Sequence, residues 1–375
     1  MTFYSLYDWI TVGIPAIAFV FTMVVFFHEL GHFLVARACG VAIETFSIGF
    51  GGELFGWNDR RGTRWKVCWL PLGGYVKFLG DENAASTPDR ERVARMTDEE
   101  KATAFPLKPL WQRVLVVAAG PFANFVLAFI VFTLLLSTVG ARTLSTYIGG
   151  VQQNSPAAEA GIRPGDKITS IDGRAVRLFR PDLQNRILNS KGRTLAIAIE
   201  RNGHNLLLHV TPRIIDAKDI FGGTQKALAI GVLPADDMTE NYVYMPVSLV
   251  EAPQMAAAEC WGIVDTSLTY LWRIVSHRAD TSGLGGPIRI AQVAKSAASH
   301  GFYDLIYLVA FISVSIGMIN LFPIPLLDGG HLLYYACEGV LGRPLDERIQ
   351  DAGFRLGLAL VIGLMIFATW NDLVR

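Results

Sequence analysis

Long apolar runs without any charge are the main feature in the pattern of hydrophobic and polar positions. These runs lie at residues 9–27, 114–141, 305–327 and 356–371. A helix needs about 20 apolar residues to cross the ~30 Å hydrocarbon core of a bilayer. The first three runs satisfy that length and the last, with 16 residues, is shorter, so a buried core helix is its alternative reading. We predict four transmembrane helices, placed within residues 1–38, 112–141, 301–331 and 350–371.

Basic residues are concentrated between the first two runs. Ten Lys and Arg residues lie between positions 60 and 108, whereas residues 1–27 contain none. Because cytoplasmic loops carry the excess of Lys and Arg, the loop at 39–111 is expected in the cytoplasm and both chain termini on the other side. A basic leader and a small-residue cleavage site are missing from the first run, so we expect that run to be retained.

Short strand-like runs and turn residues follow the second apolar run. Asn202-Gly203 separates two such runs, which is the strongest short-range signal of a hairpin. The stretch from Ser155 to Gly161 is typical of a short capped helix that ends at glycine. We therefore predict a small α+β domain at 147–213. Apolar stretches interrupted by charges predict surface-lying amphipathic helices in a linker at 214–300.

Composition supports a membrane protein and excludes several other classes. Hydrophobic residues form 51% of the chain and charged residues 18%, below the roughly 25% usual in soluble domains. Mean hydropathy is +0.36. The 33 Lys and Arg residues equal the 33 Asp and Glu residues, so no basic excess favours nucleic acid. The four cysteines are scattered, which predicts neither a disulfide framework nor a thiolate zinc site.

A candidate metal motif stands at the end of the first apolar run. Residues 28–32 read HELGH, and on a helix His28 and His32 share a face because they are four residues apart. Two imidazoles in this arrangement can bind Zn²⁺, and Glu29 can serve as the general base. Ionisable groups at membrane depth are costly, which favours a functional site over a cluster that is merely wetted at the interface.

The third ligand of such a site is expected near the end of the third apolar run. Residues 320–330 read NLFPIPLLDGG, in which Pro323 and Pro325 prevent a regular helix. Irregular backbone at membrane depth lines a cavity or is buried in protein. We predict a pocket there, with Asp328 as the ligand at the end of the third helix. The alternative reading of Asp328 is a charged residue at a helix end, before a Gly-Gly turn, without a metal-binding role. His331 is a competing candidate for the third ligand, but we expect it beyond that turn, facing water.

Together these motifs resemble the site-2 protease family, in particular its RseP-like bacterial intramembrane zinc metalloproteases. The resemblance extends from residue 26 to the C-terminal helix and includes a PDZ-like insert at 147–213, where the best-known relative has two tandem PDZ domains. It implies a polytopic α-helical protein of the bacterial inner membrane, with the PDZ-like domain in the periplasm and the active site near the cytoplasmic side. Whether that domain binds peptides or is a spacer remains open at this point.

The resemblance also assigns roles to individual residues. It implies Zn²⁺ held by His28, His32 and Asp328, with Glu29 as catalytic base. Asn320 matches the family's substrate-contacting asparagine, and residues 120–124 (GPFAN) resemble its second-helix signature. Residues 49–52 (GFGG) and 73–77 (GGYVK) resemble its membrane-associated β elements, which could pair with an unwound substrate by strand addition. The substrate-binding residues expected from these motifs are Asn320, Pro323, Pro325, Gly73, Gly74 and Tyr75.

The function expected from these residues is intramembrane proteolysis. The implied partners are the lipid bilayer and single-pass membrane proteins such as anti-sigma factors and remnant signal peptides, with no nucleic acid; the sequence leaves oligomeric state open. One alternative is a non-catalytic scaffold that binds peptide tails through its PDZ-like domain. Retention of His28, Glu29, His32 and Asp328 argues against it. A zinc transporter is a third option, but the chain shows no second intramembrane ligand cluster in its sequence.

Overall fold

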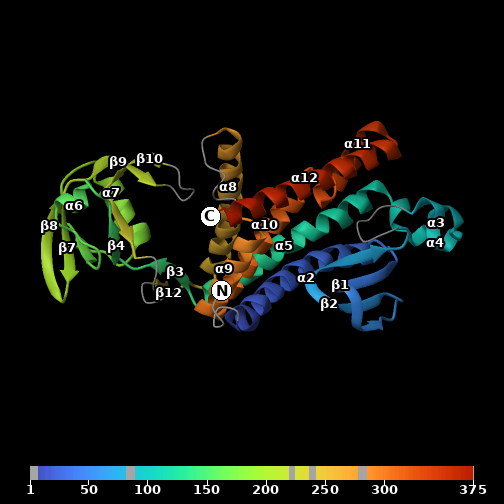
Figure 1. Ribbon diagram of the computed structural model, residues 1–375, viewed down its shortest axis with the longest axis horizontal. Coiled ribbons are helices and arrows are strands. Elements are labelled where there is room, and N and C mark those ends of the chain that lie inside the picture. The colour runs from blue at the N-terminus through green and yellow to red at the C-terminus, as the bar shows by residue number, and fades with distance from the viewer. Residues whose placement is uncertain (1–6, 82–88, 219–223, 236–241, 278–284, 375) are drawn as a thin grey trace. The chain divides into compact units, whose positions relative to one another are not determined.

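The computed structural model describes residues 7–81, 89–218, 224–235, 242–277 and 285–374. It divides into two compact units (Figure 1). The first comprises residues 1–134, 253–268 and 284–375, and the second comprises 135–252 and 269–283. Parts of the predicted loop at 39–111 and of the predicted linker at 214–300 lie outside the described residues.

Four helices among the described residues are long and apolar enough to cross a membrane. The first is α2 (Ile14–Ala38), which continues a π-helical turn, η1 (Trp9–Gly13). The others are α5 (Leu110–Thr138), α10 (Phe302–Asn320) and α12 (Glu347–Leu373). They coincide with the four predicted apolar helices, and the 27-residue length of α12 removes the shortfall expected for the last run.

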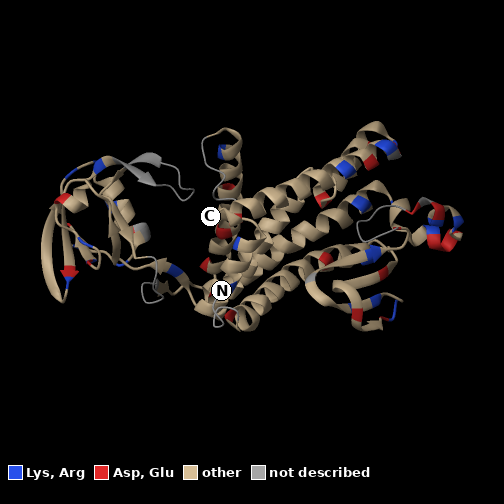
Figure 2. Cartoon of the chain, viewed as in Figure 1, with Lys and Arg blue, Asp and Glu red and all other residues tan. Residues whose placement is uncertain are grey.

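Charged side chains are unevenly distributed over the first unit. Figure 2 shows them on the short helices α3 (Arg90–Arg95) and α4 (Asp98–Thr103), whereas the middle stretches of α2 and α5 carry none. A reciprocal capping box between Thr97 and Glu100 begins α4. A short 3-10 turn, η2 (Phe105–Leu107), then leads into α5. The basic loop predicted from the sequence is therefore partly helical.

A regular stripe of buried residues holds α2 against its neighbours. Ala16, Val20 and Val24 are buried at intervals of four residues, and the same face continues to His28 and His32. The N-terminal part of the stripe, Ala16 to Val24, packs with residues of α5, α10 and a further helix, α9 (Pro287–His300). Helical periodicity thus carries the polar end of α2 into the interior of the bundle.

The two glycine motifs of the loop at 39–111 belong to one antiparallel hairpin. Its strands are β1 (Ile43–Asn58) and β2 (Arg64–Phe78). Phe46 is fully buried and stacks on Trp65 with ring centroids 4.3 Å apart. Several register shifts interrupt the pairing. The β structure expected for these motifs is therefore present, as an irregular two-stranded sheet.

Asp59 organises the turn of this hairpin. Its carboxylate accepts hydrogen bonds from the backbone N–H groups of Arg61 and Thr63, at 2.9 and 3.1 Å. It also forms an ion pair with Arg37 at the end of α2. Burial would raise the pKa of Asp59, but the hydrogen bonds from Arg37 and Arg61 outweigh it and lower the pKa to about 2. The carboxylate therefore stays charged and links the hairpin to α2.

The segment after α10 differs from the expected helix end and Gly-Gly turn. Helix α10 ends at Asn320, residues 321–327 form turns, and Asp328 is the first residue of a separate helix, α11 (Asp328–Leu341). Gly329 and Gly330 are buried helical residues. Side chains there would overlap the backbone carbonyls of Leu321 and Ile324, so these glycines allow α11 to start directly against the preceding turns. The predicted placement of Asp328 at the end of the third helix was wrong.

Helix α12 contacts both the turns before α11 and the start of α9. Its residue Gly357 lies against the carbonyl oxygen of Pro325, where a methyl group would overlap that oxygen. At its other end Asp372 accepts hydrogen bonds from the backbone N–H groups of Gly286 and Arg289, at 2.9 and 3.0 Å. These N–H groups begin α9, so α12 caps that helix. A further long helix, α8 (Glu251–Val275), is divided between the two units.

The second unit is built mainly from short strands. Its central four-stranded sheet has the order β6-β5-β7-β8. These strands are β5 (Lys167–Ile171), β6 (Arg174–Ala175), β7 (Leu195–Arg201) and β8 (His204–Val210). Two short helices, α6 (Pro156–Glu159) and α7 (Gln184–Asn189), and a π-helical turn, η3 (Phe179–Leu183), accompany the sheet. Asn202 and Gly203, both with positive φ, form the β7–β8 turn as the sequence predicted.

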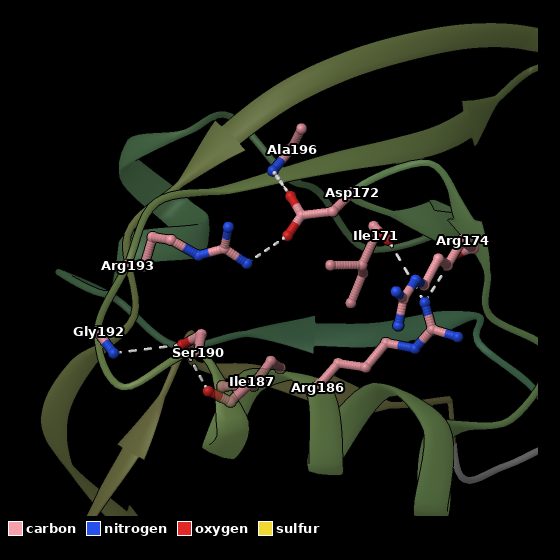
Figure 3. Close-up of polar contacts among 9 residues, drawn as sticks. All are labelled: Ile171, Asp172, Arg174, Arg186, Ile187, Ser190, Gly192, Arg193 and Ala196. Carbon is pink, nitrogen blue, oxygen red and sulfur yellow. Dashed lines mark hydrogen bonds and ion pairs between the residues drawn. The ribbon is translucent and has the colours of Figure 1, made fainter.

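Polar contacts fix the loops around α7 (Figure 3). Asp172 accepts hydrogen bonds from the backbone N–H of Ala196 and from the guanidinium of Arg193, both at 2.9 Å. The guanidinium of Arg186 donates to the backbone carbonyls of Arg174 and Ala175, both at 3.0 Å. These arginines therefore tie α7 and the following loop to the β5–β6 turn.

The second unit extends beyond the predicted boundary at residue 213. Strands β9 (Arg213–Lys218) and β10 (Thr224–Ala229) pair with each other. Strand β11 (Val232–Pro234) pairs with β4 (Ile148–Val151), and Ile230 belongs to the same buried core as Ile148. Strand β12 (Tyr242–Met245) pairs with β3 (Ala141–Leu144). The prediction of a helical linker missed β9, β10, β11 and β12, because none of these strands shows a regular alternation of apolar and polar residues.

Substitution of Gly357 tests the packing of α12. Gly357→Ala should lower the free energy of unfolding by about 1–3 kcal/mol, because the backbone oxygen of Pro325 cannot move aside like a flexible side chain. The measurement is the thermal unfolding midpoint of the purified protein in detergent. Gly363→Ala in the same helix is the control, since no atom lies within 4 Å of its added methyl group. Equal midpoints for the two variants would contradict the packing described.

Candidate metal centre

The two histidines of α2 face each other inside the first unit. Their Nε2 atoms are 3.2 Å apart, and both residues are only 8% exposed. The buried stripe of α2 places them on the side that contacts α5. Both imidazoles therefore direct the same ring atom towards one point.

The first residue of α11 brings a carboxylate to the same point. The Oδ2 atom of Asp328 lies 3.2 Å from Nε2 of His28, and Oδ1 lies 3.5 Å from Nε2 of His32. Ligand atoms of the three residues all lie within 4.8 Å of one another. The structure thus joins two motifs that are almost 300 residues apart in the sequence.

This donor set fits a tetrahedral zinc ion. With metal–ligand distances of about 2.0–2.1 Å, neighbouring ligand atoms of a tetrahedral site are roughly 3.3 Å apart. The three observed separations of 3.2, 3.2 and 3.5 Å are close to that value. Two imidazole nitrogens and one carboxylate also leave a fourth position open, as in catalytic zinc sites.

The other ring nitrogens of both histidines contact α5. Nδ1 of His32 is 2.8 Å from the carbonyl oxygen of Val116, which fixes that nitrogen as the donor and leaves Nε2 free to bind a metal. Nδ1 of His28 is 3.3 Å from the side-chain nitrogen of the buried Asn124. The side-chain oxygen of Asn124 is buried and has no hydrogen-bond partner among the described residues. Rotation of this amide exchanges the two atoms and gives His28 the acceptor that a metal-binding imidazole requires.

Glycines allow α2 and α5 to approach each other at this site. A methyl group on Gly120 would overlap the ring of His32, and one on Gly31 would overlap the carbonyl oxygen of Ala119. Small residues at helix crossings permit such close backbone contact. The GPFAN motif therefore supplies both the space for His32 and, through Asn124, a polar partner for His28.

The hairpin orients Glu29. Its Oε2 atom accepts a hydrogen bond of 3.1 Å from the backbone N–H of Val76 on β2. Nearby, the hydroxyl of Thr22 on α2 donates to the carbonyl oxygen of Pro71 at 2.9 Å, so β2 runs beside α2. Glu29 and Val76 line one cavity of about 180 Å³ together with His28, His32, Asn320, Asp328 and His331.

The position of His331 differs from the expectation. It lines the same cavity as Asp328 and does not simply face water, because α11 is helical from Asp328 onwards and one turn brings residue 331 back to the same side. Asn320, the last residue of α10, also lines the cavity. The other predicted substrate-binding residues lie on adjoining segments and not in its lining: Gly73, Gly74 and Tyr75 on β2, and Pro323 and Pro325 before α11.

Gly120, Asn124 and Val76 stand in motifs that the sequence singled out, at 120–124 and 73–77, but no individual role could be assigned to them from the sequence. For Asn124 a signal was available, since an amide in the middle of an uncharged apolar run of 28 residues is as costly as other polar groups at membrane depth. The backbone groups of Val116 and Val76 give no such signal. Their roles depend on how the helices and the hairpin pack.

Comparison with known proteins agrees with this geometry. The model of "Peptidase family M50" matches residues 16–364. A candidate zinc metalloprotease of Mesorhizobium japonicum is 44% identical over 358 residues, covering 95% of this chain and 96% of the relative. The metalloprotease MmpA of Caulobacter vibrioides is 42% identical over an alignment that covers 96% of this chain and 95% of MmpA.

The solved structures that match this chain include one that covers a quarter of it. It is the PDZ domain of an SdrC-like protein from Listeria monocytogenes, 26% identical, covering 25% of this chain and 90% of the domain, with a TM-score of 0.20. The family assignment rests on the family model and the full-length relatives alone. Together with the four apolar helices, they indicate a multi-pass membrane protein. The chain belongs to peptidase family M50, the site-2 protease family, and is a zinc metalloprotease.

Proposed function

We propose that this protein is an intramembrane endopeptidase whose zinc is held by His28, His32 and Asp328 and whose catalytic base is Glu29. The observation that carries the proposal is the convergence of the three ligand groups at the polar end of an apolar helix, with Glu29 in the same cavity. Ionisable groups in such surroundings are costly to bury unless they bind a metal or each other.

Each residue then has a defined task in hydrolysis. Zinc, when bound, is a Lewis acid that polarises the scissile carbonyl and lowers the pKa of water to about 7. Glu29 takes the proton of the attacking water and passes it to the leaving nitrogen. One carboxylate oxygen of Glu29 is held by the N–H of Val76, which leaves the other oxygen to accept the proton.

The hairpin beside α2 suits the binding of an unwound substrate. A transmembrane helix must unwind before cleavage, because its carbonyls are bonded within the helix. We infer that the substrate pairs with β2 near Gly73, Gly74 and Tyr75, by strand addition. Asn320, at the edge of the metal cavity, then contacts the scissile region. Pro323 and Pro325 keep the neighbouring backbone irregular and open to the substrate.

The proposed location is the bacterial inner membrane, with the metal centre near the cytoplasmic side. Exposed aromatic residues of the hairpin, among them Phe55, Trp57 and Trp69, are typical of a membrane interface. The proposed partners are lipids and single-pass membrane proteins, including anti-sigma factors and remnant signal peptides. The second unit is proposed to be a PDZ-like periplasmic domain that restricts access of substrates with large outer parts.

Replacement of Glu29 tests the proposed chemistry. Glu29→Gln should reduce cleavage by about 10²–10⁴-fold, the usual contribution of a general base, while zinc content stays unchanged. The amide oxygen can still accept the hydrogen bond from Val76, so the hairpin should remain in place. The measurement is product formation from tagged single-pass proteins in detergent, with bound zinc measured on the same samples. Cleavage within threefold of the wild type would remove Glu29 from the proposed role.

Replacement of Asp328 tests the third ligand. Asp328→Ala should lose zinc as well as activity, because two imidazoles alone make a weak site. Zinc is measured by metal analysis after dialysis against a weak chelator. Asp98→Ala, on the exposed helix α4, is the control and should keep its zinc. Stoichiometric zinc in Asp328→Ala would direct attention to His331 as the third ligand.

Cysteine labelling tests the proposed topology. In a variant without its four native cysteines, Glu99→Cys should resist a membrane-impermeant thiol reagent in intact spheroplasts, whereas Asn205→Cys should react. The reason is the concentration of Lys and Arg around residue 99, which favours the cytoplasm. Permeabilised cells, in which both positions should react, are the control. The opposite labelling pattern would invert the topology.

A further inference from the structure

A second and larger cavity of the first unit adjoins the metal centre. Its volume is about 560 Å³, and it shares Leu326 and His331 with the cavity that contains the three ligand residues. Leu326 has a φ of +109°, a strained conformation for a leucine that costs on the order of 1–3 kcal/mol. The structure therefore places a strained residue and an imidazole between two adjoining cavities.

The second cavity combines apolar walls with carboxylates. Phe105, Leu326, Tyr335 and Phe354 contribute its apolar lining. Asp81, Glu338 and Asp351 contribute carboxylates, and Arg113 contributes a guanidinium. If all four of these side chains are charged, the three carboxylates outnumber the one guanidinium, and the lining of the cavity has a net negative charge.

The charged groups of this cavity are not equivalent. Arg113 and Glu338 form a paired arrangement, with Nη1–Oε2 and Nη2–Oε1 separations of 3.1 and 2.5 Å. Arg113 also lies over the ring of Tyr335, at 4.9 Å from its centroid, and donates to the carbonyl oxygen of Lys108. Its charge is therefore used within the protein. Asp351, in contrast, is exposed near the start of α12 and forms no ion pair among the described residues.

We propose that this cavity binds the stretch of the substrate that connects the scissile bond to the cytoplasm, and that Asp351 selects a Lys or Arg in it. The inference rests on the proposed function. Leu326 and His331 line both cavities, so an extended chain that runs past these two residues would lead from the metal centre into the second cavity. The apolar walls accept the last residues of a transmembrane segment.

The distribution of charges in membrane proteins explains why the substrate would place a basic residue in this cavity. Segments on the cytoplasmic side of a transmembrane helix carry an excess of Lys and Arg. A substrate that leaves the bilayer on that side therefore presents a cation directly after its apolar residues. An apolar cavity with an available carboxylate at its edge is complementary to that order of residues.

The proposal is tested with purified full-length protein and model single-pass substrates in detergent. The substrates share one apolar segment and differ only in their cytoplasmic flank, which consists of lysines, glutamates or alanines. Wild type should cleave the lysine flank with a kcat/KM about threefold or more above that of the glutamate flank, as expected for a partly exposed ion pair. Asp351→Asn should bring this ratio close to one, and Asp351→Lys should reverse it.

The controls separate selection from catalysis. Asp98→Lys changes the charge of an exposed residue outside the cavity and should leave the ratio as in wild type. Turnover of the alanine flank and zinc content should stay within about twofold in all variants, because Asp351 touches neither the ligands nor Glu29. An unchanged lysine-to-glutamate ratio in both Asp351 variants would overturn the proposal.

A second measurement locates the flank directly. A photoreactive group in the lysine flank is crosslinked to the Glu29→Gln protein, and the attached peptides are identified by mass spectrometry. Crosslinks should fall among the cavity-lining residues at 93–113 and 326–354; crosslinks confined to the second unit would overturn the proposal. If wild type cleaves no substrate of any flank, the proposed function fails, whereas equal cleavage of all flanks defeats only this inference.

Discussion

The close approach of α2 and α5 is the constraint on which the metal centre depends. Two imidazoles project from an apolar helix, and each needs a polar partner for the nitrogen that does not face the ligand point. Helix α5 provides both partners, a backbone carbonyl at Val116 and the amide of Asn124, but only at the short separation that Gly31 and Gly120 permit. A larger side chain at either glycine would remove the contact that orients the histidines. The two glycines therefore belong to the structure that positions the candidate ligands.

The hairpin is a structural part of the same site as well as a candidate surface for substrate. Two hydrogen bonds, from Thr22 to Pro71 and from Val76 to Glu29, fasten β2 along α2. The ion pair between Arg37 and Asp59 fastens its turn to the end of the helix. A strand that added to β2 would consequently lie beside the base, because one backbone N–H of β2 already holds that base. In the proposed mechanism, substrate binding and proton transfer are therefore linked through the backbone of this one strand.

The sequence predicted those parts of the molecule that depend on local periodicity. Uncharged runs predicted the four long helices, and the spacing of His28 and His32 predicted that they share a face. It could not predict how far apart segments lie when they are distant in the chain. For that reason the contacts of Val116, Asn124 and Val76 with the site were missed, and so was the return of His331 to the cavity. The strands from Arg213 onwards escaped detection because their residues do not alternate between apolar and polar.

The start of a new helix at Asp328 shows why the irregular segment before it is needed. Had α10 continued, its helical rise would have carried residue 328 about 12 Å beyond Asn320, away from the residue that shares its cavity. The turns at 321–327 instead keep Asp328 beside the end of α10, and Gly329 and Gly330 let α11 start against those turns. The positive φ of Leu326 is the local strain that accompanies this compact path. Gly357 of α12 then packs against Pro325, so the segment before Asp328, the proposed third ligand, contacts both α11 and α12.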